Sequence, residues 1–174
     1  MIASEGFAPS QLALVAEALA VAEESVSDYY RLSTANWADY PYEMRTLAEL
    51  SPREVVPRAL AQVLRLRQPP RRGRLRGRDF FRICLQDHNL LGLIRREGVP
   101  ELLPALLTYV LTHELVHVVR FYRFQHLFEA EPRERVREEG RVHATTAEIL
   151  GKVRLPHLEE VINLYEAHGD YQWG

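Results

Sequence analysis

Apolar residues near the start of the chain recur at alternating steps of three and four positions. This spacing places them on one face of a helix, so the pattern predicts an amphipathic helix over residues 10–33. The stripe consists of Leu12, Val15, Leu19, Ala22, Val26 and Tyr29. Asn36 and Pro41 then interrupt the pattern, and we expect a loop with a short helix after Pro41.

A helix start signal follows at Ser51, where Pro52 occupies the first helical position and Glu54 completes a capping box. We therefore expect a helix that runs towards Arg67. Pro57 lies inside this pattern and removes a backbone donor, so the helix kinks there or restarts with Pro57 in its first turn.

Strict alternation of apolar and polar residues marks residues 79–86. Phe81, Ile83 and Leu85 share one side, which predicts a half-buried strand. Residues 87–89 read as a turn. The apolar run over 90–98 is too short for periodicity to decide between a strand and a short helix.

The last third of the chain is predicted to be helical. Residues 105–128 are apolar on nearly every face, which is typical of a helix through the core. Pro132 and Gly151 bound a further helix, and Pro156 opens a last one that ends near residue 168. The expected fold class is α+β and mostly helical, with one small sheet.

Composition limits the architecture and the compartment. The 174 residues are 47% hydrophobic, which suffices for one core and predicts a single domain over 1–174. The opening residues lack the pattern of a secretory signal, and the longest uncharged apolar run is shorter than a membrane span. We expect a cytoplasmic protein with no membrane contact. A net charge of -2 gives no overall attraction to nucleic acid.

Cys84 is the only cysteine, so any metal must be bound by histidine and carboxylate ligands. The segment His113-Glu-Leu-Val-His117 supplies such a set. On a helix, His113 and His117 project from one face and can hold one ion together. Glu114 lies on the same turn and can act as the general base that takes a proton from a water molecule. The alternative is a pair of core histidines whose hydrogen-bond acceptor is Glu114.

A catalytic zinc ion takes three protein ligands, and the chain offers several candidates for the third. A metzincin would have glycine and histidine where Arg120 and Arg123 stand, so that class is excluded. His126 lies about half a turn away from His117 and therefore faces the wrong side for a ligand unless the helix breaks. We interpret it as a surface or packing histidine.

The helix predicted after Pro132 carries better candidates. One stripe places Glu139 and His143 inward, and it comprises Val136, Glu139, His143, Ala147 and Leu150. Glu138 belongs to another stripe. We rank Glu139 first, His143 second and Glu138 last.

A histidine pair of this kind, with a glutamate on the next helix, resembles the gluzincin group of zinc metallopeptidases over residues 105–150. The resemblance implies Zn²⁺ held by His113, His117 and Glu139, Glu114 as general base, and a peptide or protein substrate. It also implies a zincin-like core over about 79–151, in which a small sheet packs against the active-site helix, with a helical part over 8–67 before it and a helix over 156–168 after it.

One position departs from the gluzincin pattern, because His143 stands where the group commonly has an aspartate that orients a zinc histidine. Three roles for His143 stay open: a partner of a ligand, a donor to the oxyanion in catalysis, or the third ligand itself. Tyr109 precedes His113 by one turn and either reaches the site or fills the core. By the same resemblance, residues 79–86 would be the edge strand that pairs with substrate, and the alternative is an ordinary strand of the sheet.

Two further functions compete with a metallopeptidase. The first is a non-enzymatic binding module, stabilised by metal, that holds an anionic partner through an arginine-rich loop. The run consists of Arg65, Arg67, Arg71, Arg72, Arg74, Arg76 and Arg78. We rank a solvated surface loop first for this run and a binding surface over 71–78 second. The second is a latent protease whose site is blocked by the residues before Ser51.

Overall fold

A computed structural model describes residues 5–67, 79–124 and 128–167 of the chain. Helices dominate, and three short strands form one sheet, so the α+β class with mostly helical content is confirmed. The elements in chain order are α1 (Pro9–Tyr30), α2 (Thr34–Asp39), β1 (Tyr42–Arg45), η1 (Leu47–Glu49), η2 (Pro52–Glu54), β2 (Ala61–Arg67), β3 (Asp79–Leu85), α3 (Asp87–Glu97), η3 (Pro100–Leu102), α4 (Leu103–Tyr122), α5 (Pro132–Leu150) and α6 (Leu158–Ala167).

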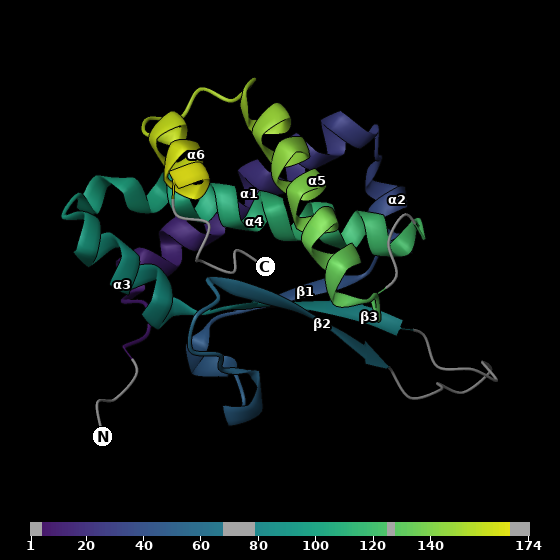
Figure 1. Cartoon of the computed structure of the whole chain (residues 1–174), viewed down its shortest axis with the longest axis horizontal. Helices are drawn as coiled ribbons and strands as arrows, with labels where there is room; N and C mark the ends of the chain where they lie inside the picture. Colours follow the sequence, from purple (N-terminus) through teal and green to yellow (C-terminus); the bar gives the residue numbers. More distant parts are fainter. Residues whose placement is uncertain (1–4, 68–78, 125–127, 168–174) are drawn as a thin grey trace.

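The helices and the sheet form two layers. Figure 1 shows α1, α4, α5 and α6 on one side of the sheet, while the segment that joins β1 to β2 hangs on the opposite side. Helix α4 runs through the middle of the helical layer, and α1, α5 and α6 pack against it. The metal motif of α4 therefore lies at the centre of the molecule.

The sheet has the order β1-β3-β2, with β3 parallel to β1 and antiparallel to β2. The strand predicted from alternation is confirmed: Phe81, Ile83 and Leu85 are all buried. The expectation that residues 79–86 form an edge strand is wrong. Strand β3 is the central strand and pairs on both sides, so its backbone groups are occupied by β1 and β2 rather than left for a peptide.

The segment around Pro41 differs from its prediction. A short helix, α2, precedes Pro41 because Ser33 caps it, accepting a hydrogen bond from the backbone N–H of Asn36 at 3.3 Å. After Pro41 the chain forms strand β1, not a helix, since Tyr42 and its neighbours pair with β3. The partner of Tyr42 in this pairing is Phe81, which lies far along the chain.

The helix predicted from Ser51 towards Arg67 is also wrong. The capping box forms, with the Ser51 N–H donating to Glu54 at 2.8 Å, but it opens only the single turn η2. The chain then enters β2, whose seven residues pair with β3 along their whole length. Long-range pairing with β3 thus overrides a local helix signal, and the part over 8–67 is helical only at its start.

The turn predicted at residues 87–89 is the first turn of α3, which also shows that the apolar run after it is helical. Asp87 is buried there and accepts backbone hydrogen bonds from Phe7 and Leu47, each at 3.0 Å. The helix ends at Gly98, whose φ of 69° is the left-handed conformation that glycine adopts most readily.

The core helix and its successor are confirmed, although α4 ends at Tyr122, before the expected residue 128. The stretch Pro100–Tyr122 is long and apolar enough to cross a membrane by composition, but 94% of its most apolar window is buried inside the protein. Such burial is typical of a helix through the core of a globular fold. The last helix, α6, begins at Leu158, two residues after Pro156.

Candidate metal centre

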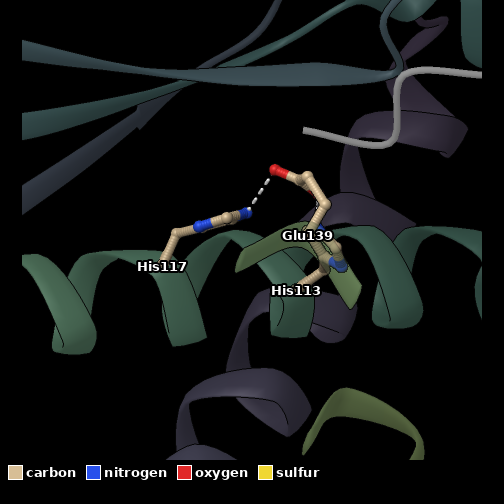
Figure 2. Close-up of side chains that lie close together, drawn as sticks. All are labelled: His113, His117 and Glu139. Atoms are coloured by element: carbon tan, nitrogen blue, oxygen red, sulfur yellow. Dashed lines mark hydrogen bonds and ion pairs between the residues drawn. The ribbon is translucent and has the colours of Figure 1, made fainter. Parts of the chain in front are cut away.

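Three side chains from two helices converge on one point. The two histidines lie one turn apart on α4, and Glu139 approaches them from α5; Figure 2 shows this arrangement. The Nε2 atom of His113 lies 3.0 Å from Oε2 of Glu139, and Nε2 of His117 lies 3.0 Å from Oε1. One potential ligand atom from each residue can be chosen so that all three lie within 4.8 Å of one another. The two nitrogens and the carboxylate therefore face a common centre.

This centre is almost entirely removed from solvent. The side chain of His113 is 0% exposed and that of His117 is 8% exposed, whereas Glu139 keeps 32%. Glu139 is thus the only one of the three that offers a substantial surface to water.

Electrostatics favour a neutral histidine opposite an ionised carboxylate. Burial is the largest influence on His113, and it lowers the pKa of the imidazole despite the hydrogen bond with Glu139, which raises it. Burial alone would raise the pKa of Glu139, but its hydrogen bond with His113 and its close contact with His117 outweigh it and hold that pKa well below its usual range. Neutral imidazole and ionised carboxylate are the forms that bind metal.

Several buried polar atoms of this centre lack hydrogen bonds within the described part of the chain. They are Nδ1 of His113, Nε2 of His117 and both carboxylate oxygens of Glu114. The His117 nitrogen lies within ion-pair distance of Glu139 but at an angle that does not make a hydrogen bond. Native proteins leave few such atoms, and each one calls for an explanation. A cation between the three side chains would give His117 Nε2 a partner.

Glu114 is 0% exposed. Burial raises its pKa well above the usual range, and the charge of Glu139 raises it further. The alternative in which Glu114 is the acceptor for two core histidines is wrong, because its oxygens accept no hydrogen bond from the described residues and the histidines face Glu139 instead.

The two neighbouring glutamates of α5 have different surroundings. Glu138 is 2% exposed and accepts two hydrogen bonds from Arg120, one of them at 3.0 Å. It is therefore placed away from the histidines, and Glu139 is the carboxylate that meets them. The inward stripe predicted for Glu139 needs correction, since Val136 is 74% exposed. The buried stripe of α5 consists of Glu138, Val142, Thr146, Ile149 and Leu150.

His143 is not part of the group of potential ligands, although it lies one turn beyond Glu139. Its Nδ1 forms a hydrogen bond with the hydroxyl of Tyr109, which is fully buried. The ring of Tyr109 lies 6.1 Å from that of His113, so this tyrosine both fills the core and borders the centre. The structure thus places His143 beside the three potential ligands, with one ring nitrogen already occupied.

Sequence reasoning missed two residues of α6 that complete these surroundings. The ring of Tyr165 stacks on His143 with 3.7 Å between centroids, and Glu166 lies 3.8 Å from Nε2 of His143. The available signal was the amphipathic spacing of Leu158, Val161 and Tyr165, which shows that these three share one face of α6. Nothing in that spacing specifies which part of the molecule the face covers.

The N-terminal helix is packed into the core of the protein. Four of its side chains are buried in the same core cluster as α4, namely Val15, Ala18, Ala22 and Val26. Helix α1 is therefore part of the fold, and removing the residues before Ser51 would expose the core rather than unblock a site. The arginine-rich patch over 71–78 and His126 both lie outside the described residues.

The chain was also compared with known proteins. No family model, no curated protein and no solved structure matches it. The zincin-like core expected over 79–151 therefore stays a prediction.

Proposed function

We propose that this protein is a zinc-dependent hydrolase of peptide bonds with a gluzincin-like site. The observation that carries the proposal is the convergence of His113, His117 and Glu139 at hydrogen-bonding distance in a buried setting. Two imidazoles and one carboxylate are a common ligand set of catalytic zinc, which leaves a fourth position open. A bound zinc ion would supply Lewis acidity towards a carbonyl group.

The protein's own residues would carry the remaining steps. Glu114 follows His113 directly on α4 and is influenced by the charge of Glu139, so it lies near the same centre. Its raised pKa suits a group that takes a proton from water and later returns it to the leaving amine. His143 would present its Nε2 as a donor to the developing oxyanion, because Nδ1 is already hydrogen-bonded to Tyr109.

A peptide backbone has a candidate pairing partner in β2. This strand is at the end of the sheet, and none of the described strands pairs with its outer edge. It packs against α4, the helix that carries both histidines. Under this proposal an extended substrate adds to β2 rather than to β3, which is already paired on both sides.

Metal analysis and one substitution test the proposal. Purified protein loaded with zinc is expected to hold one ion per chain, and His113→Ala to hold none. Glu114→Gln should keep the zinc and lose hydrolysis of a peptide library by at least about 100-fold, because only the base is removed. Glu17→Gln, an exposed position on α1, is the matched control. Unchanged turnover in Glu114→Gln would contradict the mechanism.

The complete burial of Glu114 supports a second candidate, a non-enzymatic module in which the metal only stabilises the fold. A structural ion raises stability in proportion to its binding, whether or not Glu114 can reach a substrate. Under this alternative, zinc raises the melting temperature of wild type and Glu114→Gln alike, and neither protein hydrolyses peptides. Loss of turnover in Glu114→Gln from an active wild type excludes it.

A further inference from the structure

The C-terminal helix α6 lies directly over the polar residues that border the metal centre. Its Tyr165 ring stacks almost parallel on His143, at an interplanar angle of 18°. The same ring lies 5.9 Å from that of Tyr109 and 6.3 Å from that of His113. One aromatic side chain of α6 thus contacts or adjoins residues from both α4 and α5.

This cover leaves little room for a polypeptide. His113 and Glu114 are 0% exposed, and the side chain of His143 keeps only 13%. Glu166, the residue after Tyr165, faces Nε2 of His143 at 3.8 Å, which is the nitrogen that a substrate would need. An extended chain cannot reach His143 while these two residues of α6 stay in place.

Helix α6 has fewer buried side chains than the other helices that pack on α4, although Ile162, Leu164 and Tyr165 also pack against the core while partly buried. Among its described side chains, only Leu158 and Val161 are buried. The residue before it, His157, has a φ of 71°, a left-handed conformation that is unfavourable for a residue with a β-carbon. Its ring is held by Glu160 at 2.9 Å, so the strained residue and the first turn of α6 form one unit.

We propose that α6 is a lid on the metal centre, hinged at His157 and held shut by the stacking of Tyr165 on His143. In the closed state the lid excludes polypeptides, and its displacement exposes Nε2 of His143. The proposal deepens the proposed function and rests on it for its biological meaning, since it describes how access to that same site is regulated. The latency expected from the N-terminal part of the chain is thereby assigned to the C-terminal helix.

Chemical labelling of metal-free protein tests the lid without any need for activity. Diethyl pyrocarbonate modifies accessible imidazoles, and peptide mass spectrometry gives the rate at each histidine. Val161→Ala removes an anchor of α6, and we expect it to raise the rate at His143 by about tenfold, as local opening becomes easier. The matched control is Val26→Ala, the same change at an equally buried position on α1, which should alter that rate less than about twofold.

Tyr165→Ala is the second variant, and it keeps the test decisive if Val161→Ala does not fold. Removing the half-buried ring uncovers His143 directly, so the same rise is expected. Equal rates in Val161→Ala and Val26→Ala, together with no rise in Tyr165→Ala, would overturn the lid. Failure of zinc binding would overturn the proposed function while leaving the labelling result intact, so the two proposals can fail separately.

Discussion

Two of the polar contacts between helices α4 and α5 differ in how well their groups are satisfied. At one contact Arg120 donates two hydrogen bonds to Glu138, and the pair lies in a nearly closed environment. At the other contact His113 and His117 face Glu139, and nitrogen atoms of both histidines lack hydrogen bonds within the described residues. The two glutamates are adjacent in sequence, yet only the partners of Glu139 include nitrogen atoms that lack hydrogen bonds within the described residues.

This difference distinguishes a contact that only holds two helices together from a candidate binding site. A buried charge that only holds helices together needs a complete set of partners, because an unpaired one destabilises the fold. Polar atoms that stay buried without partners weaken the fold, and they persist where a ligand or a reaction uses them. The Arg120–Glu138 pair fits the first case. The centre of His113, Glu114 and His117 fits the second.

The largest effect is expected at the Arg120–Glu138 contact. Glu138→Ala leaves Arg120 without its carboxylate in a buried setting and should lower the free energy of unfolding by about 3–5 kcal/mol. Urea denaturation of the metal-free protein measures this change. Glu134→Ala, at an exposed position of the same helix, should be nearly neutral. A small effect of Glu138→Ala would show that the contact is not the structural member of the two.

Glu139→Ala should affect zinc binding strongly and the stability of the metal-free protein less than Glu138→Ala does. It is expected to weaken zinc binding by about 100-fold, equivalent to about 2.8 kcal/mol, because a ligand is lost. The free energy of unfolding of the metal-free protein should fall less than in Glu138→Ala, since Glu139 is partly exposed. Competition with a chromogenic chelator gives the affinity. Unchanged affinity in Glu139→Ala, or an equal loss in Glu138→Ala, would remove the distinction between the two glutamates.

The sequence predicted the metal motif because its geometry is local. His113, Glu114 and His117 depend only on the helical repeat, and Glu139 follows from a stripe on the next helix. The same reasoning placed Val136 inward, where the structure exposes it, because a period of 3.6 defines faces but not which face meets the core. Tyr165 belongs to a helix whose docking position no local pattern specifies.

The secondary structure likewise divides into elements that local sequence patterns predict and elements that depend on distant residues. Helices α1, α4 and α5 were predicted from periodicity and caps over long segments. Strands β1 and β2 were not, because their stability comes from pairing with β3, whose residues lie far along the chain. Glu43 illustrates this, since it stands opposite Arg82 in the register and pairs with it through its side chain. No window around Glu43 contains that partner.

A medium effect is expected from replacing Glu114, whose buried carboxyl has no hydrogen-bond partner among the described residues. Glu114→Met replaces it with an apolar side chain of similar length, and should raise the free energy of unfolding of the metal-free protein by about 1–3 kcal/mol. Because the pKa of Glu114 is raised in the folded protein, the stability gained in Glu114→Met depends on pH. The wild type loses stability as pH rises above the unfolded carboxyl's pKa of about 4.3, and the variant lacks this loss, so the gain should be larger at pH 8 than at pH 4. A Glu114→Met variant that is less stable than the wild type would contradict this prediction.

The smallest effect is expected at the rim of the Arg120–Glu138 contact. Arg141 lies 3.8 Å from Glu138, but its side chain is 67% exposed, whereas that of Arg120 is 17% exposed and makes both hydrogen bonds. A solvated ion pair contributes less than about 1 kcal/mol, so Arg141→Ala should change the free energy of unfolding by only a few tenths. Arg120→Ala, measured beside it, should cost several times more, because Glu138 is then left buried without its main partner. Comparable losses in the two arginine variants would mean that Glu138 is held by charge alone, and the contrast with Glu139 would then rest on burial rather than on hydrogen bonding.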